Sequence, residues 1–137
     1  MNLSTELEIV LRFLLAVALG AGIGYQRERT GKAAGLRTHV LVSAGAALFT
    51  VASIYGFGVG MADISRVAAG VVIGVGFIGG GVIFRGPRGE EVAGLTTAAT
   101  IWVTAAIGLA AGAGMVLISV IATAVSVVVL SLPKIRG

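Results

Sequence analysis

The polar residues that could do chemistry in this chain stand at the ends of its long apolar runs. Arg27 and Glu28 close the first run, Arg37 and Thr38 open the second, and Thr97 lies near the start of a later one. A helix that begins at such a place points its unpaired N–H groups and its positive dipole end toward the polar side. Two such helix starts brought together would favour an anion, such as a carboxylate, a phosphate or a lipid head group, and would oppose a bare cation.

Each of these residues also has a plainer explanation. For Arg37 alone, a capped helix start beside a basic residue at the membrane surface is sufficient, with Thr38 as the cap of one helix and Thr96 or Thr97 as the cap of another. Glu28 lies among arginines, so we expect it to form ion pairs rather than a proton or metal site. His39 could titrate near neutral pH or serve only as an interfacial hydrogen-bonding group.

Several kinds of chemistry are excluded by composition. The chain has no cysteine and a single histidine, so thiol chemistry and a multi-histidine metal site are ruled out, and we expect no metal and no cofactor. We find no nucleophile–base spacing, phosphate-binding loop or zinc signature, which predicts a protein that is not an enzyme. No carboxylate interrupts the middle of an apolar run, where ion pumps usually carry one, and this argues against transport.

The composition then sets the class of protein. Of the 137 residues, 57% are hydrophobic and only 12% are charged, whereas soluble domains carry about 25% charged residues. The chain is therefore expected to be a single transmembrane domain, residues 1–137, whose first partner is the lipid bilayer. Its net charge of +4 is better explained by cytoplasmic loops than by binding to nucleic acid.

Apolar runs separated by polar breaks predict an all-α, polytopic transmembrane bundle of five spans. The predicted spans are residues 7–25, 38–57, 66–84, 95–112 and 113–132. The last two must be separated by a turn near Gly112–Gly114, because one helix over residues 95–132 would reach about 57 Å, nearly twice the thickness of a bilayer core. We expect the first helix to open with a capping box at Thr5, and Arg12 to pair with Glu8 or to extend toward the membrane surface.

The basic residues predict the orientation. Eight of the ten fall between spans one and two, between spans three and four, or after span five: Arg27, Arg29, Lys32, Arg37, Arg85, Arg88, Lys134 and Arg136. The positive-inside rule makes that side cytoplasmic. The N-terminus is then outside and the C-terminus inside.

Glycine is abundant, with 22 residues, and several lie inside span three. Gly70 and Gly74, and likewise Gly76 and Gly80, have the small-residue spacing that lets helix backbones approach closely in lipid. Packing of Gly74, Gly76 and Gly80 within the chain is the favoured interpretation, and a homodimer interface is the alternative. On the favoured interpretation, leucine at Gly76 or Gly80 reduces the amount of folded protein.

Five segments together resemble the membrane domain of the MgtC/SapB family. They are Gly20–Arg29, Gly35–Val42, Arg66–Ala69, Gly74–Gly81 and Gly94–Trp102. Many members of the family carry a C-terminal domain similar to ligand-binding ACT domains, whereas this sequence stops at Gly137. The family also often has glutamate where this sequence has Gln26.

The resemblance implies a bacterial inner-membrane protein associated with magnesium limitation and intracellular survival. Some members of the family are linked to restraint of the ATP synthase, and the family was once presumed to transport magnesium. The family motifs fall here on these candidate site residues: Arg27, Glu28, Gly35, Arg37, Thr38, Gly76, Gly80, Thr97 and Trp102.

Two functions follow from the sequence. The first is a non-enzymatic membrane regulator that acts through helix contacts with itself or with another membrane complex. The alternative is a transporter or channel for magnesium or another ion. A water-filled polar path across the bilayer would favour transport, and a closed, glycine-packed bundle would favour contact.

Overall fold

The computed structural model describes residues 1–58, 60, 63–85 and 92–134, and all five predicted segments contain a helix. The helices are α1 (Leu3–Arg29), α2 (Leu36–Tyr55), α3 (Ser65–Gly81), α4 (Leu95–Gly112) and α5 (Val116–Leu130). Two of the predicted cytoplasmic basic residues, Arg88 and Arg136, lie outside the described residues.

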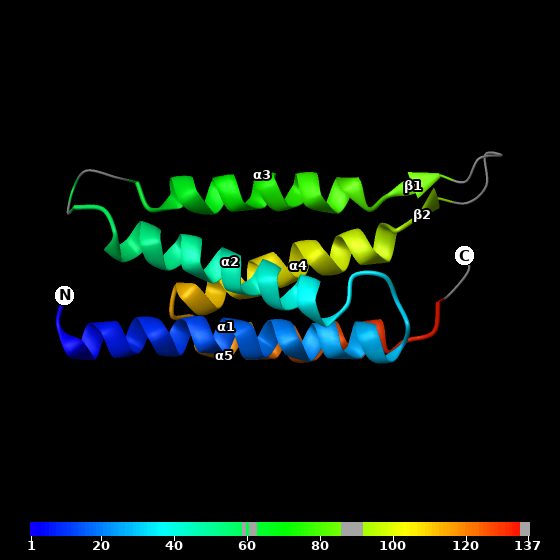
Figure 1. Ribbon diagram of the computed structural model, residues 1–137, viewed down its shortest axis with the longest axis horizontal. Coiled ribbons are helices and arrows are strands. Elements are labelled where there is room, and N and C mark those ends of the chain that lie inside the picture. The colour runs from blue at the N-terminus through cyan, green and yellow to red at the C-terminus, as the bar shows by residue number, and fades with distance from the viewer. Residues whose placement is uncertain (59, 61–62, 86–91, 135–137) are drawn as a thin grey trace.

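The five helices lie side by side and share one long axis (Figure 1). The α1–α2 loop, the short strands after α3 and the C-terminal segment lie at one end of the bundle. The N-terminus, the end of α2, the start of α3 and the α4–α5 turn lie at the other. We call the first the basic end, because it holds Arg29 at the end of α1, Lys32 in the α1–α2 loop and Arg85 in β1. The other is the opposite end.

Two strands at the basic end were not predicted. β1 (Phe84–Arg85) pairs antiparallel with β2 (Val92–Ala93), with Phe84 opposite Ala93. The third span was expected to continue to Phe84, but α3 ends at Gly81. Gly94 then starts α4 with a φ of +91°, and a Cβ atom there would lie 2.0 Å from the Val82 carbonyl oxygen. Only glycine fits this close approach of two backbones.

The first helix starts earlier than expected. Asn2, not Thr5, is its N-cap, and the Asn2 side chain accepts a hydrogen bond from the Thr5 N–H at 2.9 Å. The predicted pair of Arg12 with Glu8 is confirmed. Arg12 also donates to the Gly112 carbonyl oxygen at 3.2 Å, so it ties α1 to the end of α4.

The core is formed by α1, α2 and α4, which approach each other through small residues. Ser43 of α2 donates a hydrogen bond to the Ala16 carbonyl oxygen of α1 at 2.7 Å. A Cβ atom on Gly20 of α1 would lie 2.7 Å from the His39 carbonyl oxygen, and one on Gly108 of α4 would lie 2.1 Å from the Ser43 carbonyl oxygen. The backbone of α2 is therefore held between glycines on both sides, as close helix packing in lipid requires. α3 packs on α4 and α2, and α5 packs on α4 and α1.

The outside of the bundle is apolar, as a surface that faces lipid must be. α1, α2 and α4 are long and apolar enough to cross a membrane, whereas α3 and α5 are apolar but shorter, at 17 and 15 residues. Leu117 on α5 is 74% exposed, and Phe77 on α3 is 86% exposed. A small water-soluble protein rarely exposes so many large apolar side chains.

Candidate functional site

The site begins with Arg27, in the last turn of α1. Its side chain is only 4% exposed. The guanidinium group donates to the Ala33 carbonyl oxygen at 2.8 Å and to the Thr97 hydroxyl oxygen at 2.5 Å. Ala33 lies just before the start of α2, and Thr97 lies in the first turn of α4. The predicted convergence of these two helix starts is present, and the residue between them is Arg27 rather than Arg37.

This arrangement concentrates positive charge. No carboxylate lies within 4.0 Å of the Arg27 guanidinium among the residues that the structure describes. The N-cap residues of α2 and α4 are Gly35 and Gly94, and neither helix start has a side-chain cap. The predicted capping by Thr38, and by Thr96 or Thr97, is therefore wrong, because all three threonines lie inside their helices. A buried guanidinium between two uncapped helix starts creates an electropositive site.

Three buried polar atoms near the ends of α1 and α2 have no hydrogen-bond partner within the described part of the chain: Gln26 Oε1, Arg27 Nε and His39 Nε2. Gln26 uses its other side-chain atom, Nε2, to donate to the Leu130 carbonyl oxygen of α5 at 3.3 Å. His39 is fully buried, with Nδ1 2.9 Å from the Gly35 carbonyl oxygen. Because a carbonyl only accepts, Nδ1 carries a proton, and Nε2 is the ring nitrogen without a partner. The sequence did not identify Gln26 or His39 as members of a buried cluster, although both are polar residues next to apolar runs.

A second group of candidate residues lies together at the start of α2: Glu28, Gly35, Arg37 and Thr38. With Leu36 and Leu41 they line a polar cavity of about 260 Å³ at the start of α2. Glu28 and Arg37 are both exposed, and no ion pair joins them within 4.0 Å. Within the described residues Glu28 forms none of the expected ion pairs, because its side chain lies against Gly35 instead, with Oε1 2.9 Å from where a Cβ atom would stand.

Trp102, another of the candidate site residues, is not among the buried residues of α4. Its side chain is 57% exposed on α4. The helix buries its threonines instead: Thr97, Thr100 and Thr104 all lie on the packed side. A large indole fits a lipid-facing position better than an interface built from small residues.

The glycines of α3 also differ from the favoured interpretation. A Cβ atom on Gly74, Gly76 or Gly80 would meet nothing within 4 Å, so these residues do not pack against their own chain. In α3 the buried residues are Val71 and Gly79. Close packing occurs instead at glycines for which we made no prediction: Gly20, Gly24, Gly108 and Gly112. Gly20 and Gly24 are four residues apart, as are Gly108 and Gly112. This is the spacing of the α3 pairs, and it could have identified these four glycines as packing residues.

Comparisons with known proteins agree with the resemblance seen in the motifs. The MgtC family matches residues 13–135. "Putative magnesium transporter YhiD" of Escherichia coli K12 is 48% identical over 130 residues, covering 90% of this chain. "Protein SrpB" of Synechococcus elongatus is 42% identical over 135 residues, covering 91% of this chain. "Protein MgtC" of Brucella abortus is 45% identical over 108 residues, covering 79% of this chain. No solved structure matches the chain.

The lengths of these relatives differ from that of this chain. The matched part is 59% of YhiD, 74% of SrpB and 44% of the Brucella abortus protein. The match is nevertheless continuous over nearly all of the present sequence, from the middle of α1 to the residues that follow α5. The chain belongs to the MgtC family of membrane proteins.

Proposed function

We propose that the chain is a multi-pass protein of the bacterial inner membrane, with five spans and its basic end in the cytoplasm. The arrangement of the basic residues supports this orientation, since Arg29, Lys32 and Arg85 all lie at one end. The lengths of α3 and α5 correspond to about 25 and 22 Å. These helices are somewhat shorter than a typical core of about 30 Å, which local thinning of the bilayer accommodates.

Single cysteines test this topology cleanly, because the chain has no cysteine of its own. We expect a cysteine at Gly58, in the α2–α3 connection, to react with a membrane-impermeant maleimide added to intact cells. A cysteine at Lys32, in the α1–α2 loop, should react only after the cells are opened. The reverse pattern would show that the orientation is inverted, and labelling of both from outside would mean that the two loops share one side.

We further propose that the chain is a non-enzymatic regulator that acts by helix contact with itself or with another membrane complex. The observation that carries this proposal is the open face of α3, formed by Ile73, Gly76, Phe77 and Gly80. Their spacing of three and four residues places them on one side of the helix. Ile73 is 75% exposed and Phe77 is 86% exposed, and no atom lies within 4 Å of a Cβ atom built on either glycine.

Such a face suits a helix partner better than it suits lipid alone. Small residues at a membrane interface let two backbones approach closely, and the flanking large side chains pack around the contact. In a homodimer, the same face would be used twice across a two-fold axis. In a hetero-complex, a membrane helix of a larger assembly would occupy it, and the family resemblance makes the ATP synthase one candidate.

The core of the bundle supports contact over conduction. Where α1, α2 and α4 meet, glycines bring the helix backbones together, and the polar side chains there bond to backbone carbonyls, as Ser43 does to Ala16 and Thr104 does to Thr100. Among the described residues, no three acidic, histidine or cysteine side chains are grouped to hold a metal ion. Mg²⁺ needs oxygen ligands, usually carboxylates, and the buried Arg27 would repel it.

The alternative is a magnesium or other ion transporter. The name of YhiD refers to magnesium transport, and that relative is 48% identical to this chain. Glu28 is the candidate ligand, since it is an exposed carboxylate in the polar cavity at the basic end.

A flux measurement in vesicles separates the two functions. The purified chain is reconstituted into liposomes that enclose a magnesium-sensitive dye, and Mg²⁺ is added outside. We expect the signal to stay at the level of protein-free vesicles for the wild type and for Arg37→Ala, since neither provides a path. Magnesium entry through the wild type that is lost in Glu28→Gln but kept in Glu6→Gln, at the opposite end, would make the transporter function correct.

A further inference from the structure

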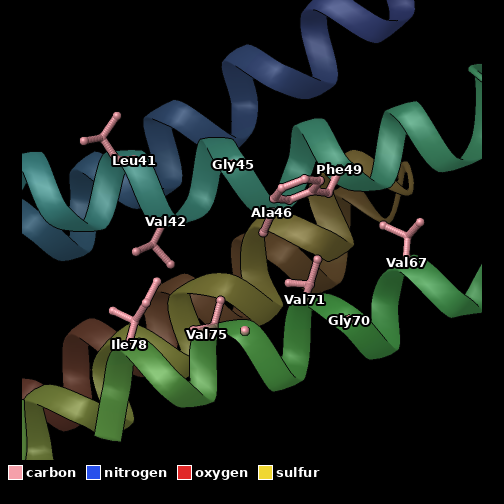
Figure 2. Close-up of a pocket in the computed structure, with 11 residues that line it drawn as sticks. Leu41, Val42, Gly45, Ala46, Phe49, Val67, Gly70, Val71, Val75 and Ile78 are labelled. Carbon is pink, nitrogen blue, oxygen red and sulfur yellow. The ribbon is translucent and has the colours of Figure 1, made fainter. Parts of the chain in front are cut away.

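A long apolar groove runs between α2 and α3. Its volume is about 610 Å³, and side chains from both helices line it, among them Leu41, Phe49, Val67 and Ile78. Figure 2 shows Val42 opposite Ile78 near one end of the groove, and Phe49 and Val67 near the other. Three of the lining residues are glycines, Gly45, Gly70 and Gly74, and a Cβ atom on any of them would meet nothing within 4 Å. Because glycine has no side chain, the groove is wide along both helices.

The groove lies next to the polar cavity at the start of α2. Leu41 lines both. The polar cavity is lined by one cationic side chain, Arg37, and one anionic side chain, Glu28. The first N–H groups of α2 are also at this cavity, because Gly35, Leu36 and Thr38 line it and no side chain caps the helix. A polar cavity with one charge of each sign thus lies directly beside a wholly apolar groove.

We propose that this composite site binds a phospholipid with a primary-amine head group, of the phosphatidylethanolamine type. The lipid phosphate lies at Arg37 and the uncapped start of α2, where guanidinium and helix N–H groups favour an anion. The lipid ammonium lies at the Glu28 carboxylate. One acyl chain fills the groove between α2 and α3.

The length of the groove fits one leaflet. Along α2 it extends from Leu41 to Phe49 and along α3 from Val67 to Ile78, which correspond to about 12 and 16 Å at the helical rise. This is about half of a bilayer core of roughly 30 Å. An acyl chain whose head group lies at the level of Arg37 therefore reaches the middle of the membrane within the groove.

Charge complementarity decides between lipid and a protein helix as the occupant. Helices α3 and α5 of a second copy contain no carboxylate, so neither could supply an anion to Arg37 and a cation to Glu28 together. A zwitterionic lipid brings both charges and the apolar chain in one molecule. The groove also lies on a different side of α3 from the open face. The lipid proposal therefore does not depend on the regulatory function. It requires only that the chain lies in a membrane.

Native mass spectrometry of the purified full chain tests the site. The protein is released from detergent after incubation with equal amounts of dioleoyl phosphatidylethanolamine, phosphatidylcholine and phosphatidylglycerol. We expect about threefold or greater retention of phosphatidylethanolamine over the other two, which is the scale of one net hydrogen bond. Phosphatidylcholine is the critical comparison, because its quaternary ammonium has the same charge but no N–H donor for Glu28.

Four variants assign the parts of the site. Glu28→Gln should bring phosphatidylethanolamine down to the level of phosphatidylcholine, and Arg37→Gln should lower the retention of all three lipids about threefold. Gly74→Leu, which fills the groove, should lower all three without changing their order. Arg66→Gln, an exposed arginine at the far end of α3, is the matched control and should behave as the wild type. A thermal melt of each variant confirms that it is folded.

Three results would overturn the proposal. Equal retention of the three lipids by the wild type would remove the head-group assignment. Unchanged retention by Gly74→Leu would show that no acyl chain lies in the groove. Disulfide formation between copies that carry Gly74→Cys, in vesicles rich in phosphatidylethanolamine, would show that a second copy occupies it instead.

Discussion

Gly108→Ala is expected to be one of the most damaging single substitutions in this protein, although it adds only one methyl group. The new Cβ atom would lie 2.1 Å from the Ser43 carbonyl oxygen and 2.8 Å from the Ser43 Cα atom, both of which are backbone and cannot rotate away. Helices α2 and α4 must therefore separate. Overpacking of this kind costs about 1–3 kcal/mol, and more where backbone is the obstacle. Because Ser43 also donates to Ala16, the separation would disturb α1 as well.

We expect the melting temperature of Gly108→Ala to fall by about 10 °C or more, using the usual conversion of a few degrees per kcal/mol. Gly76→Ala is the matched control. It adds the same methyl group to a helical glycine, but there the Cβ atom meets nothing within 4 Å. The better helix propensity of alanine should then leave the melting temperature unchanged or slightly raised. Equal melting temperatures for the two variants would show that α2 and α4 are not packed as described.

Arg27→Met is expected to loosen the α1–α2 loop while leaving the bundle folded. The Arg27 guanidinium holds the loop through the Ala33 carbonyl oxygen, at 2.8 Å. The next residue, Ala34, has a φ of +56°, a left-handed conformation that costs a non-glycine residue about 1–2 kcal/mol. Removing the arginine takes away the contact that compensates for this strain. The bundle loses little, because methionine keeps an apolar side chain of similar length in the buried position and removes the buried charge.

Trypsin cleavage after Lys32 measures this effect. Lys32 is exposed in the loop, and its cleavage requires local opening rather than global unfolding. Loss of about 1.4 kcal/mol or more of loop stability gives at least tenfold faster cleavage in Arg27→Met. Arg29→Met removes an exposed arginine from the same helix end and should cleave after Lys32 at the wild-type rate. A similar rate in both variants, or a large fall in the melting temperature of Arg27→Met, would contradict the role given to Arg27.

The helices could be predicted well because their signals are local. The predicted span at residues 95–112 coincides with α4, since polar loop residues precede it and the Gly112–Gly114 turn follows it. The first span, predicted at residues 7–25, is four residues shorter than α1 at each end. Glu6 and Arg27 were treated as polar boundaries, but glutamate and arginine are good helix formers and continue the helix. The strands at Phe84–Arg85 and Val92–Ala93 are too short to give any periodic pattern.

The site could be predicted only in part because its key contacts are long-range. The predicted order of the spans placed the starts of α2 and α4 at the same end of the bundle. The sequence did not show which arginine lies between them. Arg27 reaches Thr97, which is 70 residues away, and only the packing of α1 against α4 buries it. The same limit applies to glycine. Gly76 and Gly80 have the same spacing as Gly108 and Gly112, yet only the latter pair faces a neighbouring helix.

The measurement that tests the central claim most directly is cross-linking in living cells from the open face of α3. A photo-reactive amino acid replaces Phe77, which is 86% exposed between Gly76 and Gly80, and in a second strain it replaces Leu117, which is 74% exposed on α5. Contact through α3 predicts a discrete cross-linked species from position 77 that mass spectrometry identifies as a second copy or another membrane protein, and none from position 117. Cross-linking to lipid alone at position 77, or equal and diffuse protein cross-linking at both positions, would contradict the account.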